Sequence, residues 1–315
     1  MKIGIPNPIT YSQHINPGIY DLFKKLQEYA GESVEVSVVD GDRGLYSWQV
    51  SEDLDVFVAF GWGIDKDAVQ SRNTNTKFIT IWDDIHYRDK PGLNNRRNLF
   101  SNADHLLLGG YPMFLQMPEY ADFHDKCSWF PWWVTDELIS FGAKKKFETK
   151  EDNILLSGRI SDSYPVRQFL NYAHRENPLL KIHHHPGYGI DHNENKTHEL
   201  YYSALNNSKY CLQINAKEPL HIYHLAKLFE IPASGSLMIA NPIPRMEDLG
   251  FIHKENCILI EEQKFIDDFE SVIEEIFSIS EPEEIAKRGF ELVSSRHTTE
   301  KRVEQIITKC LEIKK

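Results

Sequence analysis

Short apolar runs alternate with polar or amphipathic segments along most of the chain, and this alternation is the feature that most limits its fold. In the first half the runs lie at residues 2–6, 34–39, 55–60, 77–82, 105–108 and 127–130. Apolar runs of this length that are bounded by turn residues are typical of strands buried on both faces of a parallel sheet. The sequence therefore predicts an α/β fold in which helices cover parallel sheets.

The second half repeats the alternation. Strand candidates lie at 154–159, 180–182, 237–239 and 257–260, and a helix runs into a further strand over 201–213. A chain of 315 residues is too long for one ordinary core and suits two domains of typical size. The stretch 141–153 is charged and non-periodic, which favours an exposed connector between the domains.

Composition restricts the setting in which the protein works. The chain has a net charge of −12, no run of eighteen apolar residues, and no signal-peptide pattern at its start. We therefore expect a soluble, cytoplasmic protein with no transmembrane segment. Its four cysteines are far apart without C-x-x-C spacing, which predicts buried thiols and neither a zinc knuckle nor a disulfide framework. The acidic balance disfavours nucleic acid as a partner or substrate.

Residues 221–251 carry the densest chemical pattern in the chain. Apolar residues recur at helical spacing up to Pro232, which is expected to end the helix near Glu230. A glycine turn and a buried strand at 237–239 follow. Lys227 and Glu230 would then lie in the last turn of a helix that packs beside a central strand. The alternative is that Glu230 only caps the helix or is solvated, as most charged residues on helices are.

A second pattern begins with the strand at 154–159, which turns at Gly158 and leads into a helix that starts at 163–167. A strand, a glycine turn and a helix start bring backbone N–H groups and the positive end of the helix dipole together, which suits a phosphate group. Arg159 and Arg167 could supply positive charge there. Alternatively, Arg167 pairs with an acidic residue on the surface.

Unusual residues follow the strands of the first half, where ligands of parallel sheets bind. The loops after the first, third and fourth strands hold His14, Trp62, and the pair Asp84 and His86. Asp84 and His86 could serve as a base and its orienting group or hold a sugar hydroxyl. Alternatively, Asp84 caps a turn and His86 packs against Trp82. No G-x-G-x-x-G loop follows the first strand, which disfavours a dinucleotide-binding domain.

Several short motifs recur together in the second half: F-E-I-P-A-S-G at 229–235, S-G-R at 157–159, Y-P-V-R at 164–167 and H-P-G-Y at 185–188. This combination resembles the GT-B glycosyltransferases, specifically the CgeB-like group with a C-terminal domain of the glycosyltransferase family 1 type. The resemblance runs from Ile154 to Ile307, whereas the first half matches only in topology.

The resemblance implies two Rossmann-like domains with an interdomain cleft. Residues 1–140 would bind the acceptor, residues 151–295 would bind the nucleotide-sugar, and a helix in 296–315 would cross back to the first domain. The implied activity is transfer of a sugar from a UDP- or GDP-sugar to a hydroxyl of a glycan or small-molecule acceptor. Neither an active-site metal nor another cofactor is expected in such a reaction.

The same resemblance implies the site residues. Glu230 matches the family glutamate that holds the ribose hydroxyls, and Lys227 matches the basic residue that faces the diphosphate. The expected donor-binding residues are Gly158, Arg159, Tyr164, Arg167, Tyr188, His221, Tyr223, His224, Lys227, Glu230 and Glu247. The catalytic candidates are Asp84, His86 and Glu230. His14 and Trp62 are expected on the acceptor side.

Some questions stay open at this point. Ile222 stands where many retaining members of the family carry a further glutamate, so the stereochemical outcome is undecided. A catalytically inert GT-B-like scaffold is one alternative function, and a two-domain small-molecule binding module is another. His183 and His185 could share one face and bind a metal, but spacing nominates no third ligand and a zinc site is not expected.

Overall fold

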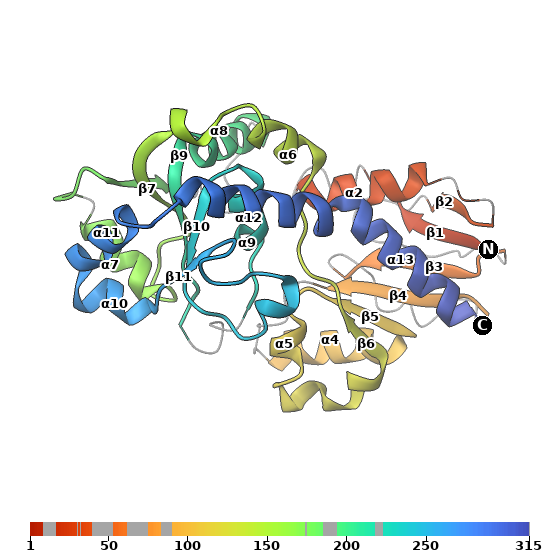
Figure 1. Cartoon of the computed structure of the whole chain (residues 1–315). Helices are drawn as coiled ribbons and strands as arrows, with labels where there is room; N and C mark the ends of the chain where they lie inside the picture. Colours follow the sequence, from red (N-terminus) through yellow and green to blue (C-terminus); the bar gives the residue numbers. More distant parts are fainter. Residues whose placement is uncertain are drawn as a thin grey trace. The chain divides into compact units, whose positions relative to one another are not determined.

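A computed structural model describes residues 1–8, 17–29, 31, 33–39, 53–61, 75–82, 90–173, 175–184, 194–217 and 223–314. The chain divides into two compact units (Figure 1). Unit 1 comprises Met1–Trp132 and Thr299–Lys315, and unit 2 comprises Trp133–Thr298. The last residues of the chain therefore belong to the first unit.

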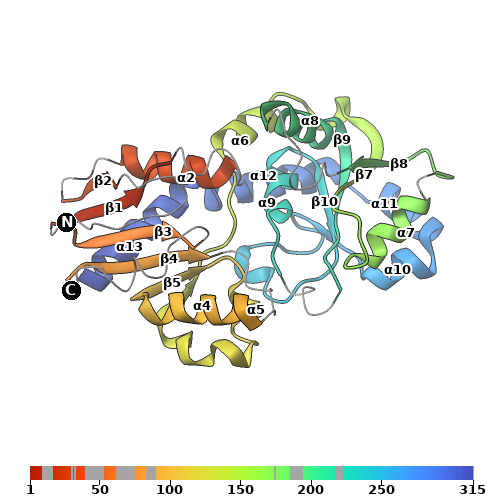
Figure 2. The same ribbon diagram turned by 180° about the vertical axis from the view of Figure 1, so that it is seen from behind.

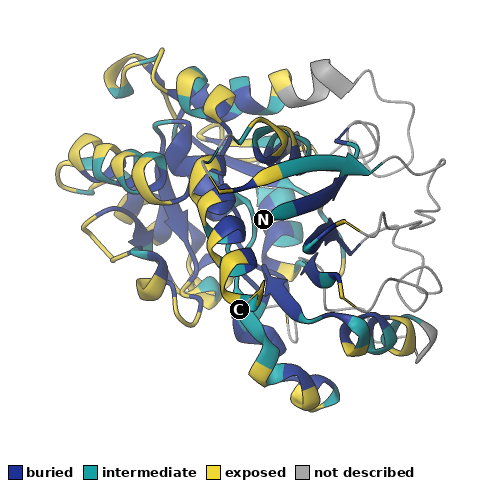
Figure 3. Cartoon of the chain, turned by 90° about the vertical axis from the view of Figure 1, so that its right-hand side faces the viewer, coloured by how far each residue is buried: buried dark blue, intermediate teal, exposed yellow. Residues whose placement is uncertain are grey.

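Unit 1 is built on a six-stranded parallel sheet in the order β2-β1-β3-β4-β5-β6. Its strands are β1 (Lys2–Pro6), β2 (Glu35–Val39), β3 (Val56–Phe60), β4 (Lys77–Trp82), β5 (His105–Leu108) and β6 (Cys127–Trp129). Its helices are α2 (Pro17–Glu28), α4 (Lys90–Asn102), α5 (Tyr111–Phe114), η1 (Pro118–Lys126) and α13 (Thr299–Lys314). All five residues of β3 are buried, as expected of a strand inside a covered parallel sheet (Figure 3).

The last helix, α13, is anchored to unit 1 by polar contacts. It packs beside α2 and against β4, in front of the first sheet in Figure 1 and behind it in Figure 2. The buried Arg302 donates to the carbonyl oxygens of Pro131 at 2.7 Å and Trp132 at 3.3 Å, and the Thr299 hydroxyl donates to Asp21 at 2.6 Å. These contacts tie the end of the chain to its first 132 residues.

Unit 2 contains a five-stranded parallel sheet in the order β11-β10-β9-β7-β8. Its strands are β7 (Glu151–Gly158), β8 (Leu180–His184), β9 (Ser208–Gln213), β10 (Leu237–Ala240) and β11 (Ile258–Leu259). Its helices are α6 (Asp136–Gly142), η2 (Phe147–Thr149), α7 (Pro165–Ala173), α8 (Glu194–Asn207), α9 (Lys227–Ala233), η4 (Glu247–Leu249), α10 (Glu262–Asp267), α11 (Phe269–Phe277) and α12 (Pro282–Arg296).

In both sheets, the chain adds its next strands first on one side of the first strand and then on the other. From β7 the chain adds β8 on one side and then β9 on the other, and in unit 1 it does the same around β1. Ligands of open α/β sheets bind at such a switch point, outside the carboxyl ends of the strands. These two parallel sheets confirm the predicted α/β fold with two Rossmann-like halves. In unit 2 the switch point lies at the ends of β7 and β9.

Three further observations bear on the sequence predictions. Residues 141–153 are not a plain connector, because they hold the end of α6, the short helix η2 and the start of β7. All four cysteines are free thiols, and three of them are buried. Within the described part of the chain, none of the helices combines the length and apolar character that crossing a bilayer requires.

Candidate functional site

Two cations converge on the turn that ends β7. Gly158 has φ of +104°, which favours glycine, and a Cβ atom there would lie 2.0 Å from Lys227 Nζ and 3.0 Å from Arg167 Nη1. Any side chain at this position would therefore displace the lysine ammonium. The end of β7 is exposed to both cations only because residue 158 is a glycine.

The Arg167 side chain extends from α7 to the switch point, where it contacts the segments that follow β7 and β9. Its side chain is 2% exposed, and its Nε atom donates to the Ile214 carbonyl, just beyond β9, at 2.8 Å. Nη1 donates to the Arg159 carbonyl at 3.3 Å, and the guanidinium carbon lies 4.0 Å from the centre of the Tyr164 ring. Burial lowers the pKa of Arg167 to about 10, so the group stays charged at neutral pH. A surface ion pair is therefore not its role.

Lys227 and Glu230 lie in the first turn of α9, not in its last turn as the sequence predicted. The helix begins at Lys227 and continues through Pro232 to Ala233. Pro232 has no N–H group for the Leu228 carbonyl, and the helix ends one residue later, where the Ser234 and Gly235 N–H groups bond to the Glu230 and Pro232 carbonyls. The bounds of the helix therefore differ from those predicted, but Lys227 and Glu230 still lie one turn apart on the same helix.

The polar contacts of this pair are few. Lys227 Nζ donates to the Ser157 carbonyl at the end of β7, and Glu230 Oε2 accepts from the Tyr201 hydroxyl at 2.9 Å. Burial, and then the neighbouring Arg167, hold the pKa of Lys227 well below its usual range. Burial raises the pKa of Glu230, against the opposing effects of Tyr201 and Lys227.

No carboxylate among the described residues lies within ion-pair distance of Arg167 or Lys227. Two basic groups, Arg167 and Lys227, therefore lie together without a described carboxylate within ion-pair distance, and Glu230 lies one helical turn from Lys227. Such an arrangement is costly for the protein alone, because like charges repel and burial penalises each of them. It becomes favourable when an anionic ligand binds between them.

Two residues that the sequence did not nominate for this site also belong to it. Tyr201, on α8, contacts Glu230, and the His183 ring at the end of β8 lies 5.7 Å from the Tyr201 ring. Burial and then Lys227 lower the pKa of His183. The described residues contain no group of three or more His, Cys, Asp or Glu side chains that could hold a metal ion.

The other predicted donor-side residues differ in exposure. Arg159 is exposed and enters the cluster through its carbonyl, whereas Tyr164 is half-buried beneath the Arg167 guanidinium. His224 is fully buried, which lowers its pKa to about 4 and keeps it neutral. Tyr223 is buried, and its carbonyl accepts from Asn215 at 2.9 Å. Glu247 is exposed in η4.

The remaining predicted residues lie outside the part of the chain that the structure describes. They are His14, Trp62, Asp84, His86, Tyr188 and His221. Ile222, which stands in place of a family glutamate, also lies outside the described residues. The catalytic candidates of the first half and the whole acceptor side thus stay predictions.

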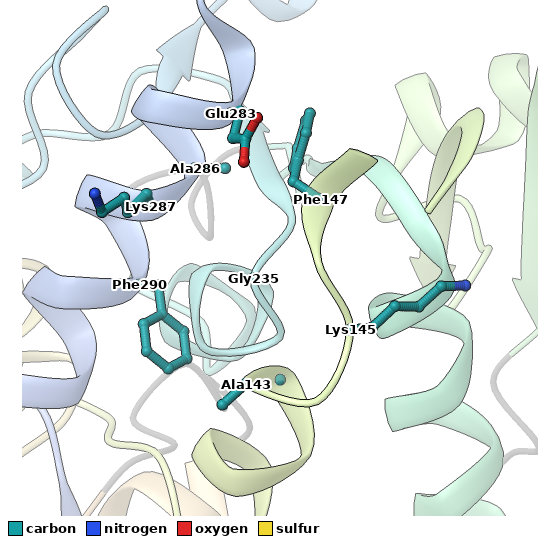
Figure 4. A pocket seen from close by; sticks show the side chains of 9 residues that line it. Ala143, Lys145, Phe147, Gly235, Glu283, Ala286, Lys287 and Phe290 are labelled. Carbon is teal, nitrogen blue, oxygen red and sulfur yellow. The ribbon is translucent and has the colours of Figure 1, made fainter. Parts of the chain in front are cut away.

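A separate hollow lies at the opposite edge of the second sheet (Figure 4). Its lining residues Phe147, in η2, and Gly235 lie a few residues before β7 and β10, near the amino ends of these strands. Phe147, Phe290 and Glu283 border the hollow, while the ends of Lys145 and Lys287 point away from it (Figure 4). This edge is not where parallel sheets bind ligands.

Residues 159–308 match the family model described as glycosyl transferase-like. This half of the chain is a glycosyl transferase-like domain. The match begins one residue after Gly158 and includes Arg167, Lys227 and Glu230. No curated protein sequence matches the chain.

Solved structures extend the likeness to the whole chain at the level of the fold. A sucrose-phosphate synthase from Thermosynechococcus elongatus has a TM-score of 0.61 with 12% identity, over 99% of both chains. An α-glucosyltransferase in complex with UDP and a DNA 13-mer has a TM-score of 0.64 with 11% identity, over 99% of both chains. A glycosyltransferase from Rickettsia africae has a TM-score of 0.59 with 11% identity, over 99% of this chain and 98% of its own. The glycosyl transferase-like domain therefore lies within a GT-B fold.

Proposed function

We propose that this glycosyl transferase-like protein transfers a sugar from a nucleotide-sugar to an acceptor hydroxyl, and that unit 2 binds the donor. The observation that carries the proposal is the pair of cations, Arg167 and Lys227, at the switch point of the second sheet with Glu230 beside them. An inert scaffold or a small-molecule binding module could bind an anion at the same cluster, so the measurement of turnover described below separates them from sugar transfer.

The cations suit the diphosphate. As the bond to the sugar breaks, negative charge grows on the departing phosphate, and fixed positive groups in a buried site stabilise that charge without reorganising. Arg167 is held in place by the carbonyls of Ile214 and Arg159, and Lys227 by that of Ser157. Because these two side chains supply the positive charge, we propose a transfer that uses no metal ion or other cofactor.

Glu230 suits the ribose. Its Oε2 atom is occupied by the Tyr201 hydroxyl, and no hydrogen bond from another described residue reaches Oε1. A carboxylate oxygen accepts from hydroxyl groups such as those of a ribose. We therefore propose that Glu230 accepts a hydrogen bond from a ribose hydroxyl of the nucleotide.

The proposed donor is a UDP- or GDP-sugar, and the proposed acceptor is a glycan or small molecule. Several structures of similar fold are complexes with UDP, which supports a uridine nucleotide. Some of the same structures also contain DNA. The net charge of −12 works against binding a phosphate backbone, so we retain the non-nucleic-acid acceptor.

The test is direct binding followed by turnover. UDP, GDP and ADP are each added to the full chain, and the shift of the melting temperature is measured; one of the three is expected to stabilise the protein by mass action. Donor hydrolysis is then measured with UDP- and GDP-sugars. Stabilisation with hydrolysis supports the transferase, stabilisation without hydrolysis of any sugar supports the inert scaffold, and indifference to all three nucleotides would overturn the proposal.

A further inference from the structure

Tyr201 is more than a packing residue of α8. Its hydroxyl donates to Glu230 Oε2 at 2.9 Å. The phenol hydroxyl thus connects α8 to the carboxylate on α9, which lies 29 positions later in the sequence.

Two contacts hold Lys227 and Glu230 of α9 from outside that helix. Lys227 donates to the Ser157 carbonyl at the end of β7. Tyr201, on α8, donates to Glu230, which lies one helical turn from Lys227. The Glu230 carboxylate is held at one oxygen by a donor that does not move with α9.

We propose that Tyr201 is a positioning residue, which fixes one carboxylate oxygen of Glu230 so that the other oxygen meets the ribose of the donor nucleotide. The proposal rests on the proposed function of unit 2. It assigns no direct contact with the nucleotide to Tyr201, which acts through Glu230.

The effect of Tyr201 on the ionisation of Glu230 favours a positioning role over a role in packing alone. A buried carboxylate is penalised in its ionised form, and burial raises the pKa of Glu230. The Tyr201 hydrogen bond acts in the opposite direction and lowers the pKa of Glu230, which favours the ionised carboxylate as an acceptor. Without the phenol hydroxyl, the carboxylate would gain freedom to rotate and would lose part of its charge stabilisation.

The test uses Tyr201→Phe, which removes only the hydroxyl. Dissociation constants are measured by calorimetry for UDP, GDP and ADP and for their 2′-deoxy forms, on the full chain. Wild type is expected to prefer the ribose form of its nucleotide by about tenfold, the worth of one hydrogen bond with a charged acceptor. Tyr201→Phe and Glu230→Gln should each reduce this preference to less than about threefold, and the double variant should be no worse than Glu230→Gln.

Tyr210→Phe is the matched control, because it removes a buried phenol hydroxyl from β9. It should keep the full preference for ribose. A loss of packing at Tyr201 would weaken both nucleotide forms equally and leave the preference intact, and that result would overturn the positioning role.

The failures of the two proposals are distinguishable. If Glu230→Gln removes the preference and Tyr201→Phe keeps it, only the positioning role falls. If wild type shows no preference, or if Glu230→Gln keeps it, the assignment of Glu230 to the ribose falls, and the role of Tyr201 falls with it.

Discussion

Buried or half-buried basic residues lie at both ends of the strands of the second sheet. Lys150 lies where the strands begin, which we call the amino edge, and Arg167 and Lys227 lie where they end, which we call the carboxyl edge. At the amino edge, Lys150 is 4% exposed and donates to the carbonyls of Asn206 and Ser234 at 2.8 and 2.9 Å. It also lies 3.2 Å from Asn206 Oδ1 and Ser236 Oγ. At the carboxyl edge, Arg167 and Lys227 stand against each other. Lys150 is a single cation whose acceptors surround it. The buried Arg167 and the half-buried Lys227 also donate to backbone carbonyls, but they bring two basic groups to one place, which favours an anionic ligand there.

Loss of a cation at the carboxyl edge should abolish donor binding, which is the largest effect we expect. Arg167→Met should weaken binding of the cognate nucleoside diphosphate by about 3–5 kcal/mol, the worth of two charged hydrogen bonds to phosphate. Calorimetric titration measures it.

Two further variants sharpen this result. Arg167→Lys keeps a charge and should lose less affinity, which separates the role in binding from a failure to fold. Arg175→Met is the matched control, because Arg175 also lies over a tyrosine ring but is exposed. If Arg175→Met weakened binding as much as Arg167→Met, the carboxyl edge would have no special role.

Loss of the cation at the amino edge should instead destabilise the fold. Lys150→Met would leave the Asn206 and Ser234 carbonyls buried without their donor, which should cost about 2–4 kcal/mol of unfolding free energy in urea denaturation. Lys145→Met removes one half-buried hydrogen bond to Asn207 and should cost less than about 1 kcal/mol. A Lys150→Met protein as stable as wild type would remove the contrast between the edges.

Glu230→Gln tests whether the carboxylate at the carboxyl edge acts in ligand binding and not in stabilising the fold. The amide keeps the shape of the side chain and loses the charge, so nucleoside diphosphate affinity should fall by about 1.5–3 kcal/mol. The melting temperature without ligand should not fall, because burial already disfavours the ionised carboxylate. An unchanged dissociation constant would refute the role of Glu230.

The smallest expected effect is a pH dependence from the amino edge. Burial lowers the pKa of Lys150 to about 8 from the ordinary 10.5. The unfolded chain then binds more protons between these values, so the stability of wild type should rise with pH. Relative to Lys150→Met, the rise should be about 2 kcal/mol from pH 7.5 to 9.5. If the stability of wild type relative to Lys150→Met instead fell over this pH range, the acceptors around Lys150 would be raising its pKa above that of the unfolded chain, which would contradict the prediction.

The sequence predicted the fold because each buried strand is a local pattern. The strand, glycine turn and helix start brought Gly158 and Arg167 together, and the resemblance to GT-B glycosyltransferases added Lys227 and Glu230 to the same expected site. The bounds of α9 were wrong because the apolar spacing before Lys227 indicated an earlier start and Pro232 an earlier end, whereas α9 begins at Lys227 and contains Pro232.

Long-range contacts could not be predicted in this way. Tyr201 meets Glu230 across 29 positions of sequence, and Lys150 meets Ser234 across 84. Lys150 stands within a charged stretch that favours an exposed connector, and its burial follows only from the packing of two helix ends around it.

The most direct measurement is a crystal structure of the full chain with UDP or GDP bound. The account predicts the diphosphate within hydrogen-bond distance of Arg167 and Lys227 beside Gly158, and the ribose on the Glu230 carboxylate. Density for the nucleotide at the amino edge of the second sheet, or anywhere else away from Gly158, would contradict it.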